Sequence, residues 1–257
     1  MRVLVTRLLD WFLGVTRLQY WPVRVRSGIA AGARWTLYPW SGYWRGKHEP
    51  SLQRALLGLG NIQGWNCWDL GAHYGLYSVG LARLAGPNGT VAAFEPNPVS
   101  YARLERHRRM NGLSNLVTFP AAVSDRSGTA GLLTYGNLRS TTTHLAYESE
   151  TLGPETRPIG VQTLVLDELV AAGHLRPPHF IKVDVEGHAH KALAGAARTL
   201  AAYRPILIVA FHSAPEVAGI MALLTPLDYD STVIATNSGS SDAVIGHDLL
   251  FRPRPRP

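Results

Sequence analysis

Cysteine is nearly absent from this sequence, and its scarcity excludes several kinds of protein. The chain of 257 residues contains one cysteine, Cys67. A single thiol can form neither an internal disulfide framework nor a metal site built from several cysteines. Cys67 falls in a predicted buried strand, so we expect an inert core residue in a protein of the reducing cytoplasm.

Charged residues are also scarce, and long hydrophobic runs are missing. Asp, Glu, Lys and Arg make up 17% of the chain, whereas about 25% is typical of globular domains. With 46% apolar residues, the chain can bury a sizeable core and is not predicted to be disordered. No uninterrupted apolar stretch reaches the roughly 18 to 20 residues that a membrane-spanning helix requires, and no signal-peptide cleavage site is evident.

Long basic runs are missing too, although the net charge is +7. A basic surface can attract phosphate, nucleic acid, anionic lipid or an acidic substrate. Nucleic-acid binding would favour a clustered basic face, but the basic residues here are dispersed along the chain. A composition rich in Arg and Ala therefore explains the charge better than a nucleic-acid interface does.

The chain is predicted to consist of an extension, one domain and a short tail. Residues 1–60 form the extension, which starts with an amphipathic helix over 1–21 and continues as an aromatic, irregular cap. We expect the helix to dock on the domain or on a second subunit, with a membrane surface as the alternative. Residues 61–252 form the domain, and the Arg-Pro repeat of 253–257 is expected to fray.

Strands and helices alternate through the predicted domain. The alternation indicates an α/β fold with a doubly wound, mostly parallel sheet that is covered by helices on both faces. A polar stretch at 136–158 predicts a long loop, and long loops in compact domains often serve as lids or binding loops. The expected strands are 66–70, 91–94, 117–123, 180–185 and 206–211, with a closing antiparallel pair at 233–235 and 247–251, and the expected helices include 76–84, 98–110 and 188–203.

Ligands of such sheets bind at the carboxyl ends of the strands. After the first strand, Gly71 and Gly75 form a turn whose backbone can approach a ligand closely. Their Gly-x-x-x-Gly spacing is not the dinucleotide signature, which disfavours an NAD-dependent oxidoreductase. Glu95 ends the second strand and can accept both hydroxyls of a ribose, while Asp69 can pair with an α-amino group. Together these features predict an adenosine ligand that carries an amino acid.

Four segments in this order and spacing resemble the FkbM family of methyltransferases. They read Asp-Leu-Gly-Ala-His-Tyr-Gly from Asp69, Ala-Phe-Glu-Pro-Asn-Pro from Ala93, Phe-Ile-Lys-Val-Asp-Val-Glu-Gly-His from Phe180, and Pro-Ile-Leu-Ile-Val-Ala-Phe-His from Pro205. The resemblance implies a Rossmann-like class I sheet of seven strands, S-adenosylmethionine as methyl donor, and a hydroxyl acceptor on a sugar or polyketide. The expected cofactor contacts are Glu49, Asp69, Gly71, Ala72, His73, Gly75, Glu95, Asn97, Ser124 and Asp125.

Three positions bear on how far the family pattern applies. His73 stands where the family often has Asn, which changes one side chain of the cofactor turn. Ala210 stands where the family often has Glu, so any role of that carboxylate is lost or assigned elsewhere. Glu49 matches an acidic position found before the first strand, and is expected to hold the methionine end of the cofactor.

Methyl transfer to a hydroxyl needs an aligned acceptor and a group that takes its proton. The catalytic candidates are His144, Asp184, Glu186 and His212, and the proton is expected to pass to His144, Asp184 or His212. Asp184, Glu186 and His212 also provide the oxygen and imidazole ligands of a possible Mg²⁺ site. Arg139 and His144 in the hydroxyl-rich loop, together with His188, are expected to bind the acceptor.

The predicted function is therefore S-adenosylmethionine-dependent O-methylation of a saccharide or a glycosylated or polyketide small molecule. The hydroxyl-rich loop favours a saccharide or oligosaccharide acceptor. Two rival functions stay open: a noncatalytic S-adenosylmethionine-binding protein and a nucleic-acid methyltransferase. The aromatic cap is expected either to complete the acceptor pocket or to bury the interface of a homodimer.

Overall fold

The computed structural model describes residues 20–37, 42–134, 143–145, 158–236 and 244–255. Arg139 and nearly all of the expected N-terminal amphipathic helix lie outside these residues. Of His144 the structure describes the backbone only.

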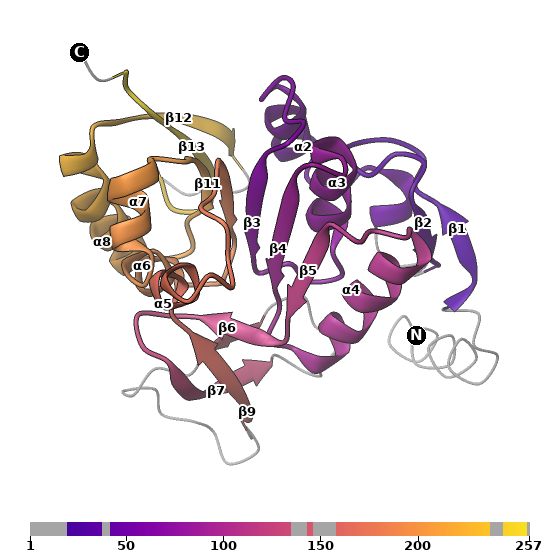
Figure 1. The fold of residues 1–257 in the computed structure, drawn as a ribbon, viewed down its shortest axis with the longest axis horizontal. Helices are drawn as coiled ribbons and strands as arrows, with labels where there is room; N and C mark the ends of the chain where they lie inside the picture. The colour runs from indigo at the N-terminus through magenta and orange to yellow at the C-terminus, as the bar shows by residue number, and fades with distance from the viewer. Residues whose placement is uncertain (1–19, 38–41, 135–142, 146–157, 237–243, 256–257) are drawn as a thin grey trace, which may run out of the picture.

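A seven-stranded sheet forms the centre of the molecule (Figure 1), in the order β12-β13-β11-β10-β3-β4-β5. Five strands pair in parallel, and β13 runs antiparallel to its neighbours β11 and β12. The mostly parallel α/β sheet predicted from the sequence is confirmed. The strands are β3 (Asn66–Leu70), β4 (Thr90–Phe94), β5 (Leu116–Phe119), β10 (Phe180–Val183), β11 (Ile206–Ala210), β12 (Tyr229–Thr236) and β13 (His247–Pro253).

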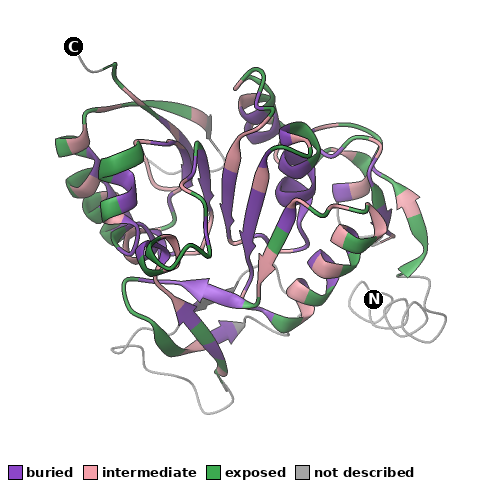
Figure 2. Ribbon diagram, viewed as in Figure 1, coloured by how far each residue is buried: buried purple, intermediate pink, exposed green. Residues whose placement is uncertain are grey.

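Helices cover both faces of this sheet, and the side chains of the strands alternate between them. In β3, Cys67 points into one core while Trp68 and Leu70 point into the other. Figure 2 shows the buried strands between the two helical layers. The first layer holds α2 (Pro50–Leu57), α3 (Leu76–Ala85) and α4 (Pro98–Met110), and the second holds α5 (Leu166–Ala171), α6 (Ala189–Ala194), α7 (Ala197–Tyr203) and α8 (Ala214–Leu224).

The described part of the N-terminal extension shares the first core. Its hairpin of β1 (Pro22–Arg24) and β2 (Arg34–Thr36) lies against α4. Trp35 is 1% exposed and stacks on His107 of α4 with ring centroids 3.6 Å apart. The short helix η2 (Tyr43–Arg45) and α2 follow, and they bring Tyr43 and Leu52 into the same core.

The structure corrects the prediction of one strand over 117–123. Pro120 separates β5 from β6 (Ala121–Val123), because proline lacks an N–H and has a fixed φ. The strand β6 belongs to a second sheet of four strands in the order β6-β9-β7-β8. Its other members are β7 (Gly128–Thr134), β8 (Thr143–Leu145) and β9 (Ile159–Leu164). The predicted loop at 136–158 thus contains a strand, and the second sheet was missed.

Two further boundaries differ from the prediction. The expected helix over 188–203 is broken into α6 and α7 at Gly195, where a Cβ would meet the carbonyl oxygen of Ser124 at 2.1 Å. The tail is also attached further than expected, because Pro253 pairs with Tyr229 and the Arg254 N–H donates to the Asp228 carbonyl. Fraying from residue 253 is therefore wrong for these first two residues of the tail.

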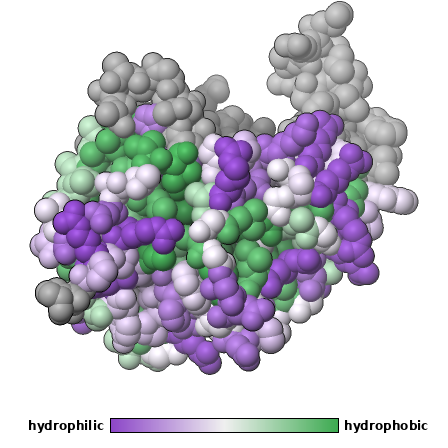
Figure 3. All heavy atoms as spheres, turned by 90° about the horizontal axis from the view of Figure 1, so that it is seen from above, coloured by the Kyte–Doolittle hydropathy of each residue, from purple (hydrophilic) through white to green (hydrophobic). Residues whose placement is uncertain are grey.

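The surface seen from above carries areas of hydrophobic residues between hydrophilic clusters (Figure 3). Leu57 of α2 and Val233 of β12 are among the exposed apolar side chains, at 48% and 47% exposure. Among the described residues, no helix is long and apolar enough to cross a bilayer.

Candidate active site

The turn between β3 and α3 lies at the point where the order of the sheet reverses, between β3 and β10. Gly71 has a φ of +80°, and a Cβ there would meet the carbonyl oxygen of Asp184 at 1.8 Å. Only glycine therefore lets this turn touch the end of β10. Gly75, with a φ of +85°, is the N-cap residue of α3, and a Cβ there would meet the Leu104 side chain at 2.4 Å. The turn that was predicted as a ligand cradle stands at the expected switch point of the fold.

Glu95 directly follows β4 and joins this turn to the next one. Its carboxylate accepts the His73 N–H at 2.7 Å and the Asn97 N–H at 2.8 Å. Burial raises the pKa of Glu95 to about 7, although these two hydrogen bonds lower it. Asn97 in turn caps α4 by accepting the Val99 N–H at 2.9 Å, so its side chain is used within the fold.

A buried lysine joins two carboxylates beneath the turn. Lys182 of β10 is 2% exposed, and its Nζ lies 3.5 Å from Asp69 Oδ1 and 3.4 Å from Asp184 Oδ2. Burial by itself would lower the pKa of Lys182, but the two carboxylates raise it above its usual range. Asp69 is fully buried and also accepts from Ser78 Oγ at 2.5 Å. Its carboxylate is thus engaged inside the protein.

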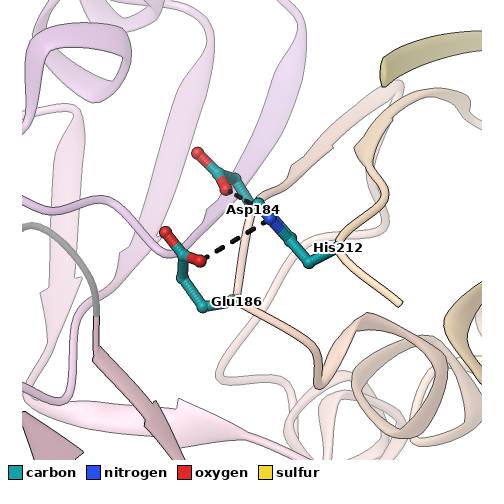
Figure 4. A group of neighbouring side chains, drawn as sticks. All are labelled: Asp184, Glu186 and His212. Carbon is teal, nitrogen blue, oxygen red and sulfur yellow. Dashed lines mark hydrogen bonds and ion pairs between the residues drawn. The ribbon is translucent and has the colours of Figure 1, made fainter. Parts of the chain in front are cut away.

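Asp184, Glu186 and His212 meet at the ends of β10 and β11 (Figure 4). His212 Nε2 lies 3.2 Å from Asp184 Oδ1, and its Nδ1 lies 3.6 Å from Glu186 Oε2. Burial lowers the pKa of His212, but Asp184 and Glu186 outweigh burial and raise it to about 9. Burial opposes ionisation of Asp184 as well, yet Lys182 and His212 hold its pKa below the usual range. In this arrangement His212 carries a proton at neutral pH.

The backbone of His212 is held by a carboxylate from the next helix. Glu216 of α8 is fully buried and accepts the His212 N–H at 2.8 Å and the Ala189 N–H at 2.9 Å. A negative charge at the first turn of α6 is electrostatically favourable. This contact fixes the segment that follows β11 relative to the segment that follows β10.

Two adjoining hollows open over the turn, and the N-terminal extension forms one wall of both. Tyr43, His48 and Glu49 line them, so the aromatic cap reaches the site. Glu49 accepts from Tyr77 Oη at 2.5 Å and lies 3.3 Å from His48 Nε2. The larger hollow extends to the second sheet, with Val123, Leu132 and Leu145 as an apolar wall.

About half of the residues that the sequence analysis named as site candidates line the two hollows. Gly71, Ala72, His73, Glu49, Glu95, Asp184, Glu186 and His188 line one or both of them. The residues that line neither hollow are Asp69, Gly75, Asn97, Ser124, Asp125 and His212. Ser124 and His188 bond to each other instead, with Oγ and Nε2 3.0 Å apart, and burial, with the charge of Lys191, lowers the pKa of His188 to about 4.

Sequence reasoning missed several residues of this site. Lys182 had a visible signal, because a lysine inside an apolar strand needs a buried partner. Asp248 of β13 had no such signal in the sequence. In the structure it pairs in register with Ala210 and is 6% exposed. Burial, with the charges of Glu49 and Asp184, raises the pKa of Asp248 to about 6. A buried carboxylate thus lies on the strand next to Ala210, the position at which the family often has Glu.

Negative groups outnumber positive ones around the hollows. The described lining includes four carboxylates, whereas Lys182 is already paired with two carboxylates and His212 lies between two. Such a balance favours a ligand with positive charge and disfavours a pyrophosphate. The four carboxylates are Glu49, Glu95, Asp184 and Glu186.

Comparisons with known proteins agree with this geometry. The chain is 29% identical to the hexuronic acid methyltransferase AglP of Haloferax volcanii over 254 residues, which cover 94% of this chain and 95% of that protein. The crystal structure of methyltransferase FkbM from Methylobacillus flagellatus shares the fold, with a TM-score of 0.52 and 19% identity over 76% of this chain and 45% of that one. The model of the methyltransferase FkbM domain matches residues 69–231. The chain therefore belongs to the family of methyltransferases with an FkbM domain.

Proposed function

We propose that this protein is an S-adenosylmethionine-dependent O-methyltransferase that acts on a saccharide. The observation that carries the proposal is the acidic hollow over the glycine turn, bounded by Glu49, Glu95 and Asp184. S-adenosylmethionine carries a sulfonium and an ammonium group, so it suits this charge better than a dinucleotide does. The buried Glu95 after β4 would accept the ribose hydroxyls.

The adenine end of the cofactor would lie against the second sheet. Val123 of β6, Leu132 of β7 and Leu145 of β8 give the larger hollow an apolar wall. Burial of an aromatic base against such side chains removes apolar surface from water. The methionine end would then point towards Glu49 and the turn at Gly71, with the methyl group near the end of β10.

His212 is the proposed base, because it contacts Asp184 and Glu186, which both line the larger hollow. Asp184 orients its ring through the bond of 3.2 Å, while the longer contact to Glu186, at 3.6 Å, is the one that an acceptor hydroxyl would replace. A positioned base contributes roughly 10²- to 10⁴-fold to such a reaction. His212 must lose its own proton first, so kcat/KM should rise with pH towards the pKa of about 9.

The same three residues also fit a divalent cation. Asp184, Glu186 and His212 offer two carboxylates and one imidazole whose ligand atoms lie within 4.8 Å of one another. Carboxylate oxygens and imidazole nitrogen are common protein ligands of divalent metals. A bound ion would orient the acceptor and lower the pKa of its hydroxyl, and His212 would then act as a neutral ligand. If activity survives complete chelation, His212 acts as the base without a metal ion. If a chelator abolishes activity and added Mg²⁺ or Mn²⁺ restores it, the three residues hold a divalent cation.

A saccharide is the proposed acceptor because the relative AglP is described as a hexuronic acid methyltransferase and matches nearly the whole chain. The first experiment is calorimetric titration with S-adenosylmethionine and, separately, with NAD⁺. Micromolar binding of S-adenosylmethionine alone supports the proposal, and binding of neither ligand contradicts it. Labelled methyl transfer to hexuronic acids and neutral glycosides follows, and survival of the product in mild alkali distinguishes a methyl ether from a methyl ester.

A further inference from the structure

The hydroxyl of Tyr43 and the imidazole of His73 form a buried pair at the wall of both hollows. Tyr43 Oη lies 2.9 Å from His73 Nδ1, and Tyr43 is 7% exposed. Among the described residues, His73 is the hydrogen-bond partner that the structure gives this hydroxyl. If Nδ1–H donated to Tyr43 instead, both the Tyr43 O–H and the lone pair of Nε2 would lack a partner among these residues. With Tyr43 donating and Nδ1 accepting, the Nε2–H is the one strong hydrogen-bonding group of the pair that is left over, so this direction is favoured.

This direction fixes the tautomer of His73. Burial, with the charge of His48, lowers the pKa of His73 to about 3, so its ring is neutral at physiological pH. A neutral imidazole has one N–H, and when Nδ1 accepts a bond the proton is on Nε2. Nε2 is buried and has no hydrogen-bond partner among the residues that the structure describes. The tautomer therefore leaves His73, a residue that lines both hollows, with an unsatisfied N–H donor.

The backbone and the ring of His73 are both held in place. The residue has a φ of +49°, and its N–H donates to Glu95 Oε2 at 2.7 Å. The ring stacks on Tyr74 with centroids 3.7 Å apart. A donor that is fixed in this way loses little entropy when a ligand binds.

We propose that His73 Nε2 donates a hydrogen bond to the α-carboxylate of S-adenosylmethionine, and that Tyr43 is the positioning residue that sets the required tautomer. The inference rests on the proposed cofactor. Glu49, Glu95 and Asp184 surround the hollows with negative charge that repels a carboxylate, so the anionic end of the cofactor needs a donor of its own. Among the described residues, the Nε2–H of His73 has no hydrogen-bond partner and is available for this role. Lys182 is not available, because it is already paired with Asp69 and Asp184.

The test compares two probes, S-adenosylmethionine and its decarboxylated form, which differ in the carboxylate alone. In the wild type, the decarboxylated probe should bind about tenfold more weakly or worse, as expected for a lost hydrogen bond to a charged group. In His73→Gly, which accepts a positive φ without strain, this ratio should fall towards one. Tyr43→Phe should reduce the ratio partway, because either nitrogen can then carry the proton.

His73→Asn is the matched variant, because Asn tolerates a positive φ and keeps an N–H donor that needs no tautomer. It should preserve the ratio between the probes, and Tyr43→Phe should change nothing further in its background. If the wild type discriminates and both His73→Gly and Tyr43→Phe keep the wild-type ratio, the inference is overturned. If the wild type binds neither probe, the proposed function fails instead.

Discussion

At the scale of single residues, Lys182 is the side chain on which the buried part of the site depends. Lys182→Met leaves Asp69 and Asp184 without their shared counter-ion, and removal of one partner of a buried pair costs about 3 to 5 kcal/mol. Urea unfolding should show a loss of this order. The control is Arg198→Met: Arg198 pairs with Asp167 at 3.4 Å but its side chain is 75% exposed, so it should cost less than about 1 kcal/mol. Equal losses in the two variants would argue against a central role for Lys182.

His212 makes the stability of the fold depend on pH in a defined window. Its pKa is about 9 in the folded protein, against about 6.5 in an unfolded chain. The folded state therefore binds the proton more tightly, and this contribution is complete below pH 6.5 and lost as pH rises to 9. The raised pKa values of Glu95 and Asp248 act in the same direction, but mostly below pH 7.

The prediction is a fall in unfolding free energy between pH 7 and pH 9 that His212→Gln flattens. Equilibrium unfolding in urea at four or five pH values across this window measures it. Glu186→Gln should flatten the fall in part, because Glu186 raises this pKa less than Asp184 does but more than Glu216 does. Parallel curves for wild type and His212→Gln would show that His212 is not the group responsible.

At the scale of elements, the glycine turn couples β3 to β10. Gly71→Ala combines a positive φ with a Cβ that would meet the Asp184 carbonyl oxygen at 1.8 Å, so it should displace the end of β10. We expect a loss of both stability and S-adenosylmethionine affinity. Gly60→Ala is the control, because Gly60 has a similar φ of +85° but nothing within 4 Å of its Cβ. Gly60→Ala should lower the unfolding free energy by about 1 kcal/mol through backbone strain alone and leave the S-adenosylmethionine affinity unchanged. If it lowers this affinity as much as Gly71→Ala does, the coupling of β3 to β10 through Gly71 is refuted.

Sequence patterns predicted the elements where local signals were strong. Asn97 and Pro98 marked the start of α4, and the apolar runs of β3, β4 and β11 marked the centre of the sheet. Failures occurred where distant contacts decide the outcome. The helix is interrupted at Gly195, where the backbone lies against the carbonyl oxygen of Ser124, a residue remote in sequence. The second sheet was missed because β6 and β9 pair across a long separation and their alternation is short.

The candidate site was predictable at the ends of the strands, which the parallel sheet brings to one edge. Asp184, Glu186 and His212 were named from the sequence and meet in space. Tyr43 was covered by the expectation that the aromatic cap either completes the acceptor pocket or buries a dimer interface. Asp248 was not named, because β13 lies far from these strands along the chain and the residue stands in no recognisable motif. Their place in the site follows from tertiary packing, for which local sequence gives no signal.

At the scale of the whole molecule, the described extension and the sheet should unfold as one unit. Tyr43, Trp35 and Leu52 share a hydrophobic core with α3 and α4, although the sequence suggested a boundary near residue 60. Five of the seven tryptophans precede that boundary, so their fluorescence reports mainly on the extension, whereas circular dichroism reports on the helices and the sheet. The two transitions should coincide for a cooperative structure.

Trp35→Ala tests this cooperation directly. Trp35 is 1% exposed and stacks on His107 of α4, and truncation of a buried tryptophan costs about 3 to 5 kcal/mol. Both transitions should shift together to lower denaturant, while Trp21→Ala, at 61% exposure, should shift neither by much. A shift of the fluorescence transition alone would define residues 20–60 as a separate unit. In that case Tyr43, His48 and Glu49 would reach the site from a detachable cap, and the donor geometry at His73 would depend on whether the cap is docked.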